Sequence, residues 1–314
     1  MIHWPRHSHR EIHLRISSLS RLIDQIIMLK LKNKIYAFAR QVLGAANIAV
    51  TKQDTFDRLI VNEAKLKRYE DFLPFLVQIK DNYLKQALRL LPESKSEIFQ
   101  DIFVALVLNA KRNGFFVEFG ATDGVAGSNT WLFEKSFEWN GLLAEPGRVW
   151  HERLAQNRNC TILHDCVWSE SGHALEFRET SDAGLSTLSD YAERDRHSFR
   201  RAEGRKTYKV KTVALDELLR RESAPRTIDY LSIDTEGSEY DILRAFPMGN
   251  WDISIITVEH NFRADRDAIH DILQKNGFVR VLTDLSKFDD WYVTSKLVLR
   301  VETVFHEIGE RGSA

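Results

Sequence analysis

Apolar residues follow two different patterns along this chain of 314 residues. In its N-terminal part they recur every three or four positions, a spacing that places them on one face of a helix. The pattern predicts helices over residues 19–29 and 72–91. It predicts a third helix over residues 94–109, with Ser94 or Ser96 as its N-terminal cap.

From Phe115 onward, short apolar runs alternate with amphipathic stretches. Strands that alternate with helices in this rhythm form a parallel sheet with helices on both faces. A further pair of strands, 174–177 and 208–213, lies on either side of a charged stretch, and a last strand over 292–299 closes the sheet. The main strands are expected at 115–119, 142–145, 161–165, 228–234, 253–259 and 278–282, with helices beginning near Asn129, Arg148, Leu215, Glu239 and Ala264.

These patterns predict an α/β fold with a doubly wound, mostly parallel sheet and an N-terminal helical region. The helical region is expected to cover residues 1–112, as an accessory, substrate-capping or dimerisation element. The α/β domain is expected to cover residues 113–314. Because the N-terminal helices carry apolar faces, a homodimer is one expected assembly.

The composition is typical of a soluble globular protein, with 43% hydrophobic and 28% charged residues. The 44 Lys and Arg residues balance 45 Asp and Glu residues, so no nucleic-acid partner is expected. Cys160 and Cys166 cannot make a disulfide framework, which favours a reducing, cytoplasmic location. The longest uncharged run, residues 41–51, is too short to span a bilayer, so no transmembrane segment is expected.

Two segments are basic in spite of this balance. Residues 1–40 contain eight Lys or Arg residues and two Asp or Glu residues. We interpret them either as a solvated helix face or as a helix that makes peripheral contact with a membrane or a partner. The stretch Tyr191–Lys211 also contains eight basic residues, among them Arg194, Arg196 and Arg205. It is either a solvated loop or a lid over an acceptor that carries phosphate or carboxylate.

The first predicted strand contains Glu118 and is followed directly by Gly120. Glycine at this point lets the backbone approach a ligand closely, because it has no Cβ. The glycines at 120, 124 and 127 do not have the G-x-G-x-x-G spacing, which disfavours an NAD-dependent oxidoreductase. Glu145 ends the second strand, where an acidic residue can accept hydrogen bonds from ribose hydroxyls. A nucleotide-type cofactor site is therefore expected here.

Polar residues also end the fourth and fifth predicted strands. Asp234 and Glu236 follow the fourth strand, and Glu259, His260 and Asn261 follow the fifth. The carboxyl ends of parallel strands meet at one edge of the sheet, and ligands bind at that edge in open α/β folds. We therefore expect these side chains to belong to an active site.

Taken in order, the motifs make residues 116–290 similar to the FkbM family of S-adenosylmethionine-dependent methyltransferases. Thr122 is a departure, since many relatives carry Asn at this position. The motifs that carry the resemblance are Val117–Gly124 with Ser128-Asn129-Thr130, Gly141–Pro146, Asn157-Arg158, Gly184–Thr187, Thr212–Leu219, Ile233–Glu239 and Val258–Asn261.

The resemblance implies a class I, Rossmann-like methyltransferase fold. It also implies an O-methyltransferase that transfers the methyl group of S-adenosylmethionine to a hydroxyl of a sugar, glycan or secondary metabolite. Glu145 would hold the ribose hydroxyls, and the backbone at Gly120 and Asp123 would face the methionine end of the cofactor. The implied cofactor site contains Glu118, Gly120, Ala121, Asp123, Ser128, Asn129, Glu145, Pro146, Asp234 and, near the adenine, Asp165 and Cys166.

A hydroxyl acceptor needs either a general base or a metal ion that acidifies it, and both alternatives stay open. In one, His260 takes the proton, with Asp234 and Glu236 completing the catalytic set. In the other, Asp234, Glu259 and Asn261 hold Mg²⁺, which prefers oxygen ligands. The alternative functions are a non-catalytic binding or scaffold protein with the cofactor fold, and a methyltransferase for another class of acceptor.

Overall fold

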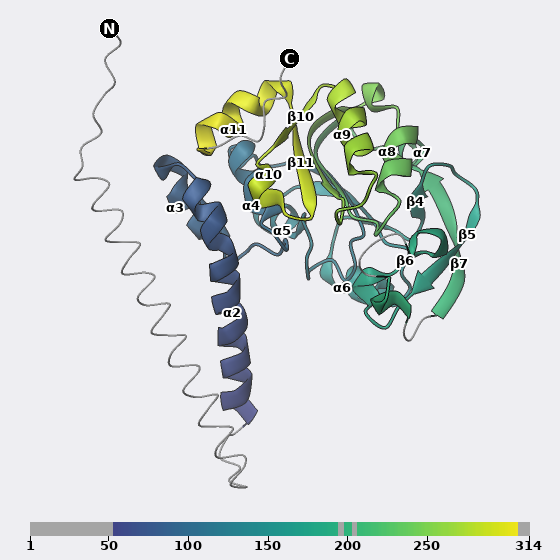
Figure 1. Ribbon diagram of the computed structural model, residues 1–314, viewed down its shortest axis with the longest axis horizontal. Coiled ribbons are helices and arrows are strands. Elements are labelled where there is room, and N and C mark those ends of the chain that lie inside the picture. Colours follow the sequence, from purple (N-terminus) through teal and green to yellow (C-terminus); the bar gives the residue numbers. More distant parts are fainter. Residues whose placement is uncertain (1–52, 194–197, 203–205, 307–314) are drawn as a thin grey trace, which may run out of the picture. The chain divides into compact units, whose positions relative to one another are not determined.

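The computed structural model describes residues 53–193, 198–202 and 206–306 (Figure 1). The helix expected at 19–29 and the basic segment 1–40 lie outside the described residues. So do Arg194, Arg196 and Arg205 of the expected lid. None of the described helices is long and apolar enough to cross a membrane.

The chain divides into two compact units, Met1–Lys67 and Arg68–Ala314. Helix α2 (Gln53–Gln78) contains the point of division, and every later helix and strand belongs to the second unit. The expected functional residues all lie in this second unit.

A seven-stranded sheet forms the centre of the second unit (Figure 1). Its strands, in their order across the sheet, are β10 (Phe278–Val281), β11 (Asp289–Thr294), β9 (Asp252–Glu259), β8 (Thr227–Ile233), β1 (Phe115–Phe119), β2 (Asn140–Ala144) and β3 (Thr161–Leu163). The strands from β9 to β3 pair in parallel, whereas β11 pairs antiparallel with both β9 and β10. The α/β class is confirmed, but the sheet is mixed, so a doubly wound, mostly parallel sheet is not confirmed.

The last strand differs from the prediction of 292–299. β11 ends at Thr294, and the residues that follow form a 3-10 turn, η5 (Ser295–Leu297), and helix α11 (Val298–Val304). A short connection containing helix α10 (Thr283–Ser286) joins β10 to β11. A parallel crossover needs a dozen or more residues, so these two strands pair antiparallel.

A second sheet stands beside the first. It contains, in order, β4 (Cys166–Trp168), β7 (Lys206–Ala214), β5 (Ala174–Glu179) and β6 (Thr187–Leu188). The expected pairing of 174–177 with 208–213 is confirmed as antiparallel, with Phe177 opposite Tyr208. The prediction missed β4 and β6, because strands of two or three residues carry no periodic pattern.

Helices cover both faces of the main sheet (Figure 1). Tyr230 and Leu231, neighbours in β8, belong to different hydrophobic cores because side chains alternate across a strand. The core that contains Tyr230 includes residues of α4 (Gln100–Val107), α5 (Trp131–Phe137) and α11. The core that contains Leu231 includes residues of α7 (Leu215–Arg221), α8 (Glu239–Ala245) and α9 (Arg266–Lys275), while α6 (His151–Asn157) follows β2. The helices after β1, β2, β7, β8 and β9 begin within three residues of their expected positions.

The helical segment before β1 shares a core with the sheet. Phe72 and Phe75 of α2 pack against Phe99, and Phe75 also contacts Trp291 of β11 and Phe305. All five side chains are buried in one core. The boundary expected at residue 112 passes through this core, and the division into two domains there stays a prediction.

The expected helix 72–91 is two helices. α2 ends at Gln78 and α3 (Asp81–Leu90) follows, while Ile79 between them pairs with Phe305 in an isolated β-bridge. The C-terminal segment thus interrupts a pattern that looks continuous in sequence.

α4 begins later than expected, after Phe99, which has a left-handed backbone (φ 69°). Neither Ser94 nor Ser96 is its N-cap residue, although the Ser96 hydroxyl accepts a hydrogen bond of 3.1 Å from the Asp101 amide in its first turn. They lie in a loop fastened to Asp101, whose carboxylate accepts hydrogen bonds from the Ser94 hydroxyl and the Lys95 amide.

Candidate functional site

Two adjoining cavities lie at the carboxyl ends of the parallel strands. The smaller, of about 70 Å³, reaches Glu145, Pro146 and Cys166, and we call it the inner cavity. The larger, of about 330 Å³, we call the outer cavity. Their shared walls are formed by Gly120, Thr122, Gly184, Asp234 and Glu236.

Glu145 is the most deeply placed acid of the inner cavity, with 5% of its surface exposed. Its Oε1 accepts a hydrogen bond of 2.6 Å from the Gly147 amide, and its Oε2 accepts one of 2.9 Å from the Thr122 amide. Burial raises the pKa of the carboxyl to about 7. The two amides fix its orientation and leave the remaining lone pairs of its oxygens for a ligand.

Gly120 lets β1 and β8 come together where the cavities meet. Its φ is +74°, in the left-handed region that favours glycine. A Cβ at this position would lie 1.8 Å from the carbonyl oxygen of Asp234. No other residue fits there, and the backbone itself forms this part of the cavity wall.

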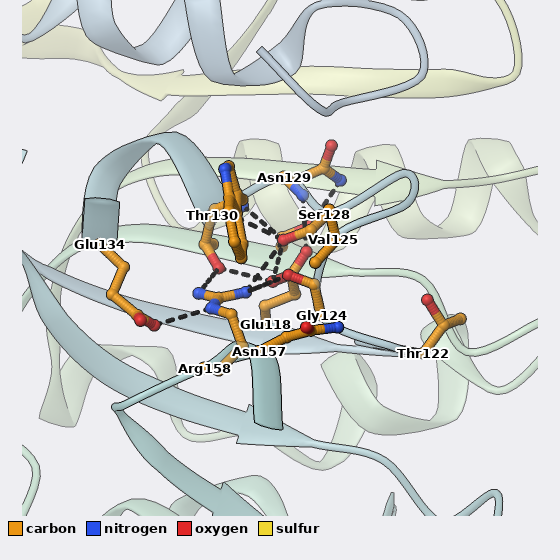
Figure 2. A network of polar contacts seen from close by, with 12 residues as sticks. Glu118, Thr122, Gly124, Val125, Ser128, Asn129, Thr130, Glu134, Asn157 and Arg158 are labelled. Atoms are coloured by element: carbon orange, nitrogen blue, oxygen red, sulfur yellow. Dashed lines mark hydrogen bonds and ion pairs between the residues drawn. The ribbon is translucent and has the colours of Figure 1, made fainter. Parts of the chain in front are cut away.

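Glu118 of β1 is turned toward the loop that follows the strand (Figure 2). Its Oε1 accepts a hydrogen bond of 2.7 Å from the Asn129 amide. Its Oε2 accepts bonds from the hydroxyls of Ser128, at 3.0 Å, and Thr130, at 2.5 Å. Glu118 is not among the residues that line either cavity. In this geometry its carboxylate shapes the loop.

Arg158 completes the same network from the other side (Figure 2). Its guanidinium donates to the Gly124 carbonyl and to the Ser128 hydroxyl, both at 3.1 Å, and to Glu134 at 2.7 Å. The neighbouring Asn157 amide donates to the carbonyl of Asp123 at 2.8 Å. The Asn157-Arg158 motif therefore holds residues 123–128 in place, a role that the sequence alone did not reveal.

The acids after β8 and β9 lie together. Asp234 and Glu259 both line the outer cavity, and oxygens of Asp234, Glu239 and Glu259 lie within 4.8 Å of one another. Burial raises the pKa of Asp234 and of Glu259 well above the ordinary range, and nearby carboxylates add to the effect. Burial also raises the pKa of Asp289 to about 7. Oε2 of Glu259 has no hydrogen-bond partner among the described residues.

Glu239 is less available to a metal ion than its position suggests. Its Oε1 accepts hydrogen bonds from the amides of Thr235 and Gly237, and its Oε2 pairs with Arg263. Of the three clustered acids among the described residues, only Asp234 and Glu259 are therefore available to bind a cation. The magnesium site stays a prediction, and we derive no step through a metal ion.

Glu236 connects the site to the basic segment. It has a left-handed backbone (φ 57°), and its Oε2 lies 2.5 Å from the guanidinium of the fully buried Arg201. Arg201 also donates to the Leu185 carbonyl at 2.7 Å. Arg201 is therefore buried behind the cavity wall and does not belong to a solvated face.

His260 has structural partners on both sides of its ring. Its Nδ1 accepts a hydrogen bond from the Phe262 amide at 2.9 Å, and its Nε2 lies 3.1 Å from the Asp289 carbonyl. Burial lowers its pKa to about 4. It does not line either cavity, so the geometry does not favour it as the base.

The structure brings together most, but not all, of the expected site residues. Asp165 pairs with Arg221, and Asp123 accepts hydrogen bonds from the amides of Val125 and Ala126. The expected residues that line a cavity are Gly120, Asn129, Glu145, Pro146, Cys166, Asp234, Glu236, Glu259 and Asn261; those that do not are Glu118, Ala121, Asp123, Ser128, Asp165 and His260.

Sequence reasoning missed several cavity residues. Glu97, Gln100 and Phe288 line the outer cavity from segments outside the motifs, and Arg200 does so from the basic segment. The sequence signals for the site were strand ends and the family motifs, and Glu97, Gln100 and Phe288 carry neither. Arg200 belongs to the basic stretch that was expected to be a solvated loop or a lid over the acceptor.

The fold and the site together define an α/β protein with a ligand site at the carboxyl edge of its parallel strands, where such folds bind nucleotides. Residues 118–282 match the methyltransferase FkbM domain. The chain belongs to the FkbM methyltransferase family, as its motifs predicted. No curated protein matches the chain.

Proposed function

We propose that this protein is an S-adenosylmethionine-dependent O-methyltransferase. The observation that carries the proposal is the pair of adjoining cavities. The inner one contains the Glu145 carboxylate at the position of a ribose ligand, and the outer one is polar and meets it at Gly120 and Asp234. A methyl donor whose ribose is held at Glu145 would reach from the inner cavity into the outer one, where the acceptor would bind.

The residues present fit this cofactor. Glu145 is oriented by two backbone amides and has lone pairs left for the ribose hydroxyls. Phe177 and Leu188 add apolar wall to the inner cavity, which suits an adenine ring. Asp234, which lines both cavities and has no ion pair with a cation among the described residues, suits a ligand that carries positive charge on its sulfur and its amino group.

The bound cofactor supplies an electrophilic methyl group on a positively charged sulfur. The protein aligns the acceptor oxygen with that methyl group and keeps water away from the reaction. As the oxygen–carbon bond forms and the carbon–sulfur bond breaks, the hydroxyl must lose its proton. We assign the proton to the pair Asp234 and Glu259, because both line the outer cavity and His260 does not.

In this proposal the acceptor is a polar compound with a hydroxyl group, such as a sugar, a glycan or a secondary metabolite. The test is mass spectrometry of candidate acceptors incubated with the protein and deuterium-labelled S-adenosylmethionine. Transfer of the labelled methyl group to oxygen supports the proposal. Transfer to nitrogen or carbon would replace it with another class of methyltransferase, and cofactor binding without any transfer would favour a binding protein.

A further inference from the structure

The outer cavity is built partly by segments that flank the family region. The FkbM match covers residues 118–282. Glu97 and Gln100 line the cavity from before this region, and Phe288 lines it from after it. The family region forms the inner cavity and most of the outer one, and Glu97, Gln100 and Phe288 are the lining residues of the outer cavity that lie outside it.

The segment that carries Glu97 is fixed by buried and partly buried polar contacts. The Arg68 guanidinium donates to the carbonyls of Ser94, at 3.1 Å, and Ser96, at 3.0 Å. Asp101 accepts a hydrogen bond of 2.7 Å from the Ser94 hydroxyl. Ser96 also forms an isolated parallel bridge with Gly127, in the loop from Gly124 to Thr130. These contacts hold the segment in a fixed position at the wall of the outer cavity.

Gln100 and Glu97 have different positions in this wall. Gln100 is buried, donates to Asp289 at 2.8 Å and accepts from the Ile98 amide at 3.1 Å, so its amide is already used. Glu97 is exposed to solvent at the cavity, with no ion pair or hydrogen bond among the described residues. Glu97 is therefore the flanking charge that remains available to an acceptor.

The charges of the described residues that line the outer cavity do not cancel. Arg200 is the one cation among its described lining residues, and it pairs with Asp182. Glu236 is matched by Arg201. The lining acids left without a cationic partner among the described residues are Glu97, Asp234 and Glu259.

Burial raises the pKa of Asp234 and of Glu259 and so favours their protonated forms, so these two acids do not count as two full negative charges. In addition, Oε2 of Glu259 is more than nine-tenths buried and has no donor among the described residues. A ligand that fills the outer cavity can bring hydrogen-bond donors to this oxygen, and an anionic group there would meet Glu97 and the buried acid pair with no unpaired cation among the described lining residues.

We propose that the acceptor carries a protonated amine near the methylated hydroxyl, as an amino sugar does, and that Glu97 selects it. This inference rests on the proposed function. It differs from the expectation of a lid that binds phosphate or carboxylate, which stays a prediction: Arg200 and Arg201 pair with Asp182 and Glu236, whereas Arg194, Arg196 and Arg205 lie outside the described residues.

The test measures binding of three matched probes to the full chain saturated with S-adenosylhomocysteine. The probes are glucosamine, glucose and glucuronate, titrated by NMR at about pH 6.5, where the amine is protonated. Glucosamine is expected to bind most tightly and glucuronate most weakly. Glu97→Gln should weaken glucosamine binding by roughly fivefold, the scale of one accessible ion pair, and leave glucose binding unchanged. Glu97→Lys should move the preference toward glucuronate.

Glu93→Gln is the matched control, because Glu93 is an exposed acid of the same region that does not line the cavity. It should leave all three affinities unchanged. Equal or tighter binding of glucuronate, an unchanged glucosamine affinity in Glu97→Gln, or no binding of any probe to the S-adenosylhomocysteine complex would overturn the inference alone. Failure of S-adenosylhomocysteine to bind would instead overturn the proposed function.

Discussion

The guanidinium of Arg158 and the carboxylate of Glu118 form a buried ion pair, with NH1 3.6 Å from Oε2 (Figure 2). Neither side chain lines a cavity, yet both bind the loop from Gly124 to Thr130. The wall of the outer cavity, to which Ala126, Gly127 and Asn129 of this loop contribute, thus depends on charges placed behind it.

Replacement of Arg158 by Ala should destabilise the protein by about 3–5 kcal/mol, because Glu118 stays buried without its cation. Arg158→Lys restores the charge but not the several directed hydrogen bonds, so it should recover only part of the loss. Denaturant unfolding measures both. Arg226→Ala, which removes an exposed pair with Asp252, is the control and should cost about 1 kcal/mol or less. Equal effects of Arg158→Ala and the control would refute this role.

Gly120 and Gly127 allow a comparison between two glycines of one loop. Their φ values are +74° and +75°, so Ala at either position carries a similar backbone strain of about 1–2 kcal/mol. Only at Gly120 does the new Cβ also meet an atom, the Asp234 carbonyl oxygen at 1.8 Å. Cofactor titration calorimetry should show lost binding in Gly120→Ala and retained binding in Gly127→Ala. Retained binding in both variants would contradict the assigned contact.

The Glu145 carboxyl should make cofactor binding depend on pH. Its pKa is raised to about 7 by burial, and the ionised form accepts hydrogen bonds from ribose hydroxyls best. The affinity should therefore increase as the pH rises from about 6 to about 8, and it should be weak and independent of pH in Glu145→Gln. Calorimetric titrations across this range measure both. An unchanged pH dependence in Glu145→Gln would assign it to another group.

The raised pKa of Glu145 has the opposite effect on the stability of the ligand-free protein, which should decrease as the pH rises. The folded carboxyl holds its proton more tightly than the unfolded one, whose pKa is near 4.5. Glu145 therefore favours folding at low pH, and this contribution is lost as the pH rises through about 7. In Glu145→Gln the free energy of unfolding should fall less over this range. A wild-type and a variant curve of equal slope would contradict the assignment.

Two variants test which residue is the general base. Their activity is measured with the acceptor that the labelled-cofactor experiment identifies. Glu259→Gln should lower kcat by about a hundredfold or more, because it removes a proton acceptor from the cavity. His260→Asn should lower stability by about 1–3 kcal/mol through its lost hydrogen bonds and should largely preserve kcat. The reverse result would restore His260 as the base. Activity that EDTA removes and Mg²⁺ restores would confirm the magnesium prediction.

The parallel core could be predicted from sequence because its strands are continuous apolar runs that end in polar residues. β1, β8 and β9 were found in this way, and their ends supplied Gly120, Asp234 and Glu259. Strand periodicity and strand ends are local properties of a chain.

The remaining features depend on contacts between distant residues. Gln100 reaches the cavity wall through Asp289, which is 189 positions away. His260 ends a strand just as Glu259 does, and only the fold reveals that its ring nitrogens face Phe262 and the Asp289 carbonyl. The two-residue strand β6 and the loop before α4 likewise take their shape from their partners.

The most direct test of the account is the binding of S-adenosylmethionine itself, measured as a thermal shift of the wild-type protein and of Glu145→Ala. A ligand that binds only the folded state stabilises it by about 2.7 kcal/mol at a hundred times its Kd. We predict a clear increase in the Tm of the wild type and the loss of most of that increase in Glu145→Ala. An unchanged wild-type Tm at millimolar ligand would contradict the proposed function.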